Sequence, residues 1–145
     1  MVAQKPKGVN FHESEWEFVF PPSIDNEEMY NEYYEGVELL DYNDVEAEQI
    51  FKKIIKKHPY HIDAYNHLSI AFKNQKKSFE SFLTAEKSYL IGKSCLPKEF
   101  KQSKHKLRWS NLDNRPFLRS CHILGMEHQD RKQYKEAIQL YSEIL

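Results

Sequence analysis

Seven histidines and two cysteines are the residues of this 145-residue chain best suited to chemistry. His58 and His61 are close in sequence, but the intervening Pro59 prevents them from sharing one face of a helix. His122 and His128 are six residues apart, which places them on different faces of a helix. Zinc sites bring their ligands together at tighter spacings. We therefore expect no metal site and no other cofactor.

Catalytic signatures such as GxSxG, HExxH and glycine-rich phosphate loops are missing from the sequence, which contains only four glycines. The chain is therefore predicted to catalyse no reaction. A metal-dependent or hydrolytic enzyme that uses Cys121, His122 and His128 is a less favoured alternative.

Charge is unevenly distributed along the chain, although the net charge is only −1. Residues 1–50 hold thirteen acidic and two basic side chains, whereas residues 51–108 hold four acidic and fourteen basic ones. The basic run from Lys98 to Arg108 has aromatic neighbours and could suit single-stranded nucleic acid. It is also typical of the solvated face of a helix, and the chain lacks the strongly basic character of nucleic-acid-binding domains. Nucleic-acid binding is therefore not expected.

The two cysteines form no CxxC motif and follow no apolar signal segment, which favours a reducing, cytoplasmic setting. No apolar run approaches the roughly 18 residues that a membrane-spanning helix needs. We expect no membrane association.

One spacing of residues recurs along the chain and predicts repeated helical units. A small residue is followed by an aromatic, a further residue that continues the same helical face, and a proline that ends the helix. The three occurrences are Ala47, Phe51, Ile54 and Pro59; Ala85, Tyr89, Gly92 and Pro97; and Ala137, Tyr141 and Ile144.

Each unit also requires a preceding partner helix. Apolar periodicity predicts these helices over residues 26–40, from residue 63 through Phe72, and over 117–130. Asp25, Asp44 and Asp63 are predicted to cap helix N-termini with their carboxylates.

At these positions the sequence resembles the tetratricopeptide repeat. The third unit follows that pattern without a gap, the second has four extra residues before Ala85, and the first is one residue short before Ala47. The resemblance implies an all-α fold in which about three antiparallel helix pairs stack as a right-handed solenoid. The repeat domain would span 26–145, with units at about 26–59, 60–97 and 117–145. Trp109 to Arg119 is similar to a segment of bacterial repeat proteins related distantly to the suppressor-of-tumorigenicity-7 family, which implies no defined activity.

Two stretches depart from the repeat. Residues 1–25 are predicted to form an extended arm, because Trp16, Phe18 and Phe20 alternate with acidic residues. The arm is expected to cover the exposed face of the first unit, or alternatively to dock on a second copy, and residues 1–7 are expected to be disordered.

The second departure is an insertion over residues 98–116. Pro116 suits the first turn of a helix, with Asn114 or Asp113 as its cap, and Trp109 is expected to be buried under the insertion. Arg115 and Arg119 share a helical face and could hold a carboxylate, or could instead form an internal salt bridge to the acidic first unit.

The first helices of stacked pairs line a concave surface in such repeats. We therefore predict a non-catalytic module that binds a peptide or helix of a partner protein with an apolar anchor and one or two carboxylates. Some such repeats hold a chaperone's C-terminus with lysine and asparagine residues, and of the corresponding positions here only Arg119 fits, so this type of binding is not expected. An alternative is self-assembly into a homodimer through the apolar residues Tyr141, Ile144 and Leu145. The predicted groove residues are Tyr33, Val37, Asn66, Ile70, Lys73, Arg119, His122 and Met126.

Overall fold

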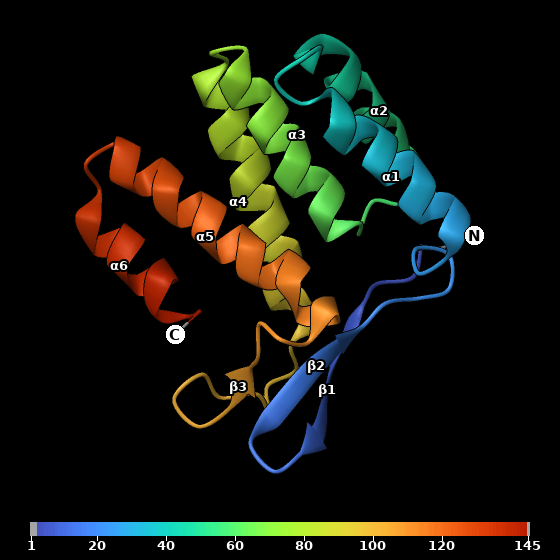
Figure 1. Ribbon diagram of the computed structural model, residues 1–145. Helices are drawn as coiled ribbons and strands as arrows, with labels where there is room; N and C mark the ends of the chain where they lie inside the picture. The colour runs from blue at the N-terminus through green and yellow to red at the C-terminus, as the bar shows by residue number, and fades with distance from the viewer. Residues whose placement is uncertain (1–2, 145) are drawn as a thin grey trace.

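The computed structural model describes residues 3–144, and this part of the chain is mostly helical with a small three-stranded sheet. Each helix packs against the next along the chain, and α3 also packs against α5 (Figure 1). The prediction of a mainly helical fold with an extended N-terminal arm is therefore right in outline, but it did not include the small sheet that the arm forms with residues 106–107. The helices are α1 (Glu27–Leu39), α2 (Asp44–Lys57), α3 (Ile62–Asn74), α4 (Ser78–Cys95), α5 (Arg115–Asp130) and α6 (Tyr134–Ser142).

The first three helices begin at side-chain caps that differ from the predicted aspartates, whereas within residues 3–144 no side-chain cap bond is found at α4, α5 or α6. Asn26, Asn43 and His61 accept from the backbone N–H groups of the first turns of α1, α2 and α3. Asp44 and Asp63 lie just inside the helices, where a negative charge still favours the helix N-terminus. Asparagine is as good a cap as aspartate, so Asn26 and Asn43, which lie immediately before the first helical residue, form the cap bonds.

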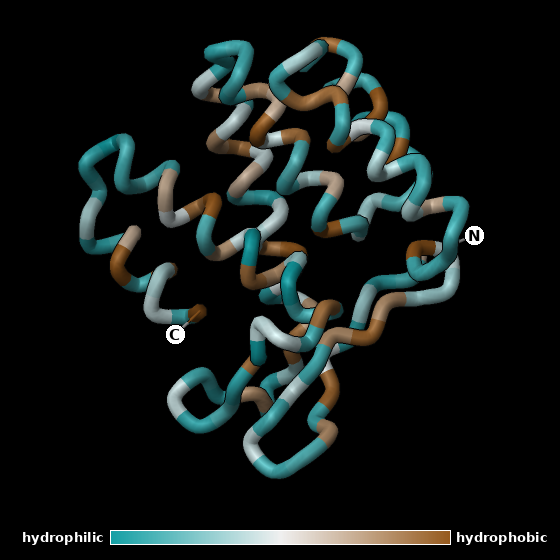
Figure 2. The backbone as a smooth tube through the Cα atoms, viewed as in Figure 1, coloured by the Kyte–Doolittle hydropathy of each residue, from teal (hydrophilic) through white to brown (hydrophobic). Residues whose placement is uncertain are grey.

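A residue with left-handed backbone marks the turn within each helix pair: Asp41, Lys76 and Lys132 have φ values of 71°, 62° and 59°. Both the α3–α4 and the α5–α6 turns are hydrophilic in Figure 2. Ala137 follows Lys132 by five residues, and the residue five positions after Lys76 is Ser81.

The predicted register of the second unit is therefore wrong. Ser81 takes the place of Ala137, and Ala85 takes the place of Tyr141, so the middle pair contains no four-residue insertion. Ser81 is fully buried, and its carbonyl oxygen accepts a 2.8 Å hydrogen bond from the Ser69 hydroxyl on α3. A serine can replace alanine at this close approach because its own hydroxyl donates to the carboxylate of Glu127 on α5.

Aromatic rings pack on glycines in the first and third pairs. A Cβ atom at Gly36 would lie 2.7 Å from the ring of Phe51, and one at Gly125 would lie 2.5 Å from the ring of Tyr141. Any larger residue at these glycines would push the paired helices apart. The glycines therefore set the separation within each pair.

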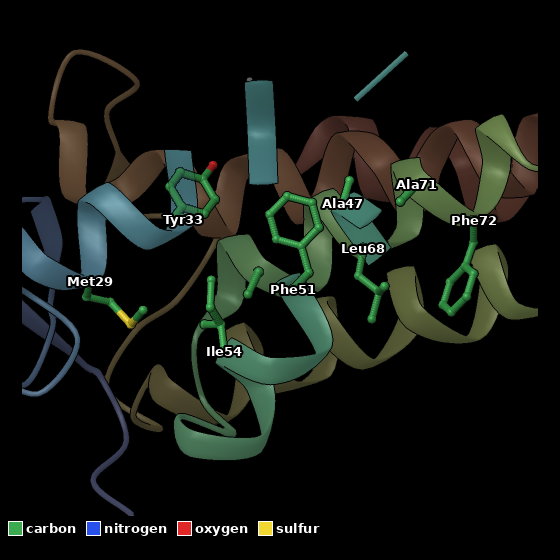
Figure 3. Packing of buried hydrophobic residues seen from close by; sticks show 9 residues of the cluster. Met29, Tyr33, Ala47, Phe51, Ile54, Leu68, Ala71 and Phe72 are labelled. Atoms are coloured by element: carbon green, nitrogen blue, oxygen red, sulfur yellow. The ribbon is translucent and has the colours of Figure 1, made fainter. Parts of the chain in front are cut away.

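The largest apolar cluster lies between α1, α2 and α3 (Figure 3). Phe51 and Ile54 are fully buried at its centre and project from α2 toward the other two helices. Because α2 presents these residues one turn apart, one face of the helix is covered by both neighbours. The buried members are Met29, Tyr33, Ala47, Phe51, Ile54, Ala64, Leu68, Ala71 and Phe72.

The N-terminal segment forms a hairpin of β1 (Lys7–His12) and β2 (Glu15–Val19), and β2 pairs in parallel with the short strand β3 (Lys106–Leu107). As predicted, Trp16 and Phe18 are buried on one side of the extended chain. The expected docking place on the first unit is wrong. Phe18 packs instead in a cluster with residues of α3, α4 and α5, and its ring stacks on Phe117 at 5.4 Å.

Two further expectations about these segments are corrected. Residues 3–7 are placed, with Pro6 buried, whereas Met1 and Val2 lie outside the described residues. The basic run from Lys98 to Arg108 forms turns and β3 rather than a helix, because its backbone pairs with β2.

Candidate functional site

A groove of about 570 Å³ lies between α1, the beginning of α3 and the beginning of α5, and the link from β2 to α1 closes one end. We call it the α1–α3–α5 groove. Figure 1 shows α3 between α1 and α5, so three helices that are distant in sequence meet here. The apolar and aromatic lining consists of Phe20, Ile24, Tyr30, Tyr33, Tyr34, Val37, Leu112 and Pro116, and the polar lining of Asp25, His61, Asp63, His67, Arg115 and Arg119.

One face of α1 supplies the aromatic wall. Tyr30, Tyr33, Tyr34 and Val37 recur at the spacing of a helical face. Tyr33 is buried, whereas Tyr30 and Tyr34 are 46% and 55% exposed. The Tyr30 hydroxyl donates to Asp25 at 2.8 Å, and this bond to a carboxylate raises the pKa of Tyr30 to about 12. The wall therefore offers large rings to solvent, one of them held in place by a hydrogen bond.

The floor of the groove is a buried set of aromatic rings around Tyr33. Its ring lies 5.6 Å from that of His61 and 5.2 Å from that of His67. Nδ1 of His67 is 2.8 Å from the carbonyl oxygen of Asp63, which can only accept, so this nitrogen carries the proton. The Tyr33 hydroxyl then donates to Nε2, 3.3 Å away.

Both imidazoles of the floor are held in the neutral form. Burial lowers the pKa of His67 and lowers that of His61 to about 4. Nδ1 of His61 accepts from the N–H of Ala64 at 3.0 Å, which caps α3. Burial also raises the pKa of the Tyr33 hydroxyl. The Tyr33–His67 hydrogen bond thus holds α1 against α3, whereas Nδ1 of His61 caps α3 itself.

Arg119 and Arg115 stand on the α5 side of the groove. Arg119 forms an ion pair with Asp63 at 3.5 Å, so the predicted internal salt bridge exists but reaches α3 rather than the acidic first unit. This follows from the packing of α5 against α3. Arg115 donates from Nε to the carbonyl oxygen of Trp109 at 2.9 Å.

Trp109 is 53% exposed, so the prediction that its ring is buried is wrong. The guanidinium carbons of Arg115 and Arg119 lie 4.8 Å and 5.8 Å from its ring centroid, which covers part of the ring with cations instead of apolar residues. Pro116 does lie in the first turn of α5, as predicted. Asn114 precedes α5, but its side chain makes no cap bond and instead pairs with the backbone of β2.

Of the eight residues predicted for the groove, Tyr33, Val37 and Arg119 line it. Asn66 is fully buried and donates to the carbonyl oxygen of Pro116 at 2.8 Å, so its side chain is not offered to a partner. The other four lie outside the groove. Tyr30 and Tyr34 were missed, and Arg115, predicted as a possible carboxylate ligand, was not placed in the groove.

The four outlying residues lie farther along α3 and α5. Lys73 pairs with Asp130 at 3.0 Å, and the His122 ring lies 5.9 Å from that of Tyr141 on α6. Ile70 is half-buried and Met126 is exposed. The groove is confined to one end of these helices because the β2–α1 link and the insertion build its walls there.

The alternative catalytic trio is not brought together. Cys121 is fully buried, and burial raises the pKa of its thiol. His122 is exposed, and His128 is hydrogen bonded to Gln133 at 2.7 Å. Within residues 3–144, no three histidine, cysteine or carboxylate side chains converge as metal ligands would.

No protein-family model, curated protein or solved structure matches this chain. The groove is therefore interpreted from its own chemistry. Among the described helices, none has the length and apolar character needed to cross a membrane.

Proposed function

We propose that this chain is a non-catalytic interaction module that binds a short segment of a partner protein in the α1–α3–α5 groove. The observation that carries the proposal is an open cavity of about 570 Å³ in which Tyr30, Tyr34 and Leu112 remain exposed. Partly exposed aromatic rings around a concave site are typical anchors for apolar side chains of a partner.

We further propose that the three helix pairs have a tetratricopeptide-like organisation. The three helix pairs share a left-handed residue at their turns, and the outer two pack an aromatic ring on a glycine. In a right-handed solenoid of such pairs, the first helices line the concave surface. The groove is formed by the three first helices α1, α3 and α5, which is where such a solenoid binds its partner.

The polar groups of the groove favour binding over catalysis. His61 caps α3, His67 is hydrogen bonded to Tyr33 and Asp63, and Asp63 is paired with Arg119. A general base must be free to reach a substrate proton, and these groups are committed to helix packing. Two carboxylates in the lining, Asp25 and Asp63, also disfavour a nucleic-acid backbone. Because both cysteines are free thiols, a reducing cytoplasm suits the proposal.

A random peptide library selected against the full chain tests this proposal. Tyr34→Glu places a charge in the groove, and Tyr42→Glu is its matched control because Tyr42 lies outside the groove and is 91% exposed. We expect selected peptides to bind Tyr34→Glu at least about tenfold more weakly in fluorescence anisotropy, and Tyr42→Glu unchanged. Equal binding to both variants, or failure to recover any specific peptide, would refute the groove as a binding site.

Self-assembly is a second candidate function. The predicted contacts Tyr141 and Ile144 are half-buried, and Leu145 lies outside the described residues. The observation that favours assembly is elsewhere on α6, where Tyr134 and Ile138 are both exposed one turn apart. Sedimentation velocity would show a concentration-dependent dimer that Ile138→Glu abolishes. A monomer at all concentrations would eliminate this candidate.

A further inference from the structure

We infer that Arg115 binds a carboxylate of the partner segment, so that the groove selects an acidic residue close to an apolar or aromatic anchor. The inference rests on the proposed function and specifies the chemistry of the ligand. It comes from the way in which the insertion holds this one arginine.

Arg115 is fixed in position without using the edge of its guanidinium group that recognises carboxylates. Its Nε donates to the Trp109 carbonyl at 2.9 Å, and its guanidinium carbon lies 4.8 Å from the Trp109 ring centroid. Among the described residues, no hydrogen bond uses its two terminal nitrogens and no carboxylate lies within ion-pair distance. These two nitrogens form one of the two edges of a guanidinium group that can bind a carboxylate through two parallel hydrogen bonds.

The other charged side chains of the groove already have partners. Arg119 pairs with Asp63, and Asp25 accepts from the Tyr30 hydroxyl. A ligand that bound Arg119 through a carboxylate would compete with Asp63 for the same guanidinium. Arg115 is therefore the cation of the groove whose charge is not already paired with a carboxylate among the described residues.

The charge of the lining indicates a carboxylate rather than a phosphate. Asp25 and Asp63 line the same groove as Arg115 and Arg119, so the site is close to electrical balance. A singly charged carboxylate adds less repulsion from these aspartates than a phosphate, which carries nearly two charges at neutral pH. The preferred ligand is thus a peptide with aspartate or glutamate.

The insertion over residues 98–116 gains a role from this geometry. It supplies both the carbonyl and the ring that hold Arg115, and it is itself tied to the hairpin. The Asn114 side chain accepts from the backbone N–H of Phe18 at 2.9 Å and donates to the carbonyl of Trp16 at 3.2 Å. An arginine held in advance loses less side-chain freedom on binding, which strengthens recognition.

The test is selection of a random twelve-residue peptide library on the full chain, on Arg115→Gln and on Arg108→Gln. Arg108 is the matched control because it lies outside the groove and pairs with Glu15. We expect the wild type and Arg108→Gln to enrich an acidic residue near an aromatic one. Arg115→Gln should keep the aromatic preference and lose the acidic one. Thermal unfolding of each variant confirms that it is folded before selection.

A double-mutant cycle on one selected peptide then measures the pair directly. Replacing the acidic residue of the peptide by its amide should weaken binding to the wild type by about tenfold and leave binding to Arg115→Gln nearly unchanged. Arg115→Lys, which keeps the charge but not the two parallel donors, should fall between the two.

Three outcomes would overturn the inference. In the first, the amide peptide binds more weakly than the acidic peptide by the same factor for the wild type and for Arg115→Gln. In the second, the selected peptides show no acidic preference. In the third, a phosphorylated peptide binds tenfold more tightly than its glutamate counterpart. In each case the proposed function survives if Tyr34→Glu still abolishes peptide binding. It fails when binding is insensitive to Tyr34→Glu or when no specific peptide is recovered, so the two failures are separate.

Discussion

The two faces of α3 are packed in different ways. Toward α1 and α2 the interface is mainly apolar, with Phe51 and Ile54 fully buried. Within the described part of the chain, a hydrogen bond joins α3 to α1 only where Tyr33 meets His67. Toward α4 and α5 it is polar at its centre. The fully buried Asn66 accepts from Ser88 at 2.6 Å and from Ser120 at 3.0 Å, which joins three helices through one amide.

The difference indicates two roles. Apolar burial at the first interface contributes stability in proportion to area and tolerates small shifts. The hydrogen bonds of the second require particular distances and so fix where α5 begins. Asn66 also donates to the Pro116 carbonyl at 2.8 Å, directly after Arg115. The polar interface thus positions the wall of the groove that holds the free guanidinium.

Removing the central ring of the apolar interface should have the largest effect. Phe51→Ala leaves a cavity next to Gly36 and is expected to lower the free energy of unfolding by about 3–5 kcal/mol. Urea denaturation followed by circular dichroism measures this loss. Phe79→Ala, at an exposed position of α4, is the control and should change stability by less than about 0.5 kcal/mol. Similar values for both variants would contradict the assigned core.

Removing the polar centre should cost less. Asn66→Ala leaves the Pro116 carbonyl and the serine hydroxyls with fewer partners, and we expect a loss of about 2–3 kcal/mol in the same denaturation experiment. Asn74→Ala is a matched control, because Asn74 forms exposed hydrogen bonds to Asp41 and Asp44. A cost below that of Asn74→Ala would show that the buried amide does not hold the three helices together.

The two interfaces also explain what the sequence could predict. Helix positions follow from apolar periodicity, and the aromatic contact residues Phe51 and Tyr141 of the outer pairs follow from the recurring spacing. The glycines that they contact, Gly36 and Gly125, come from the structure. The register of the middle pair was wrong because Ala85 was taken as the small contact residue. The actual residue is Ser81, whose place at the helix contact rests on hydrogen bonding as well as size.

The groove was predicted only in part for a related reason. Tyr33, Val37 and Arg119 follow from the helical face of each first helix, whereas Arg115 depends on contacts made by the insertion. Local periodicity also does not show that residues 98–108 supply a strand to the hairpin. The pairing of β2 with β3 joins Glu15 to Lys106, which are far apart in the sequence. Such long-range pairings carry no signal in one sequence.

The floor of the groove should make stability depend on pH. His61 has a pKa of about 4 when folded and 6.5 as its ordinary value, so the unfolded chain binds the proton more readily in this range. The buried neutral imidazole of His61 contributes its full share of the free energy of unfolding above pH 6.5, and this share is lost as the pH falls toward 4. We expect a loss of about 2 kcal/mol between pH 7 and pH 5, to which His67, also lowered in pKa, adds. The groups that face His61 are Asp63, His58 and His67.

His61→Asn is the variant that isolates this effect, because asparagine can cap α3 without titrating. Urea denaturation at several pH values should give a shallower dependence for His61→Asn than for the wild type. Glu48 has a lowered pKa in the folded chain, so the unfolded chain takes up its proton first as the pH falls through the ordinary value of 4.5. Glu48 therefore adds a loss of stability at more acidic pH than His61 does. An unchanged slope between pH 7 and pH 5 would mean that His61 is solvated in the folded chain.

The smallest effect is expected at Lys73, which was predicted to line the groove and lies outside it. Its ion pair with Asp130 is exposed, so Lys73→Ala should change stability by less than about 0.5 kcal/mol. Binding of a selected peptide should also stay within about twofold of the wild type, in contrast to Tyr34→Glu. Anisotropy titrations of both variants measure this difference. A clear loss of binding with Lys73→Ala would extend the partner's footprint along α3 toward the end of α5, and the groove would then be one end of a longer concave site.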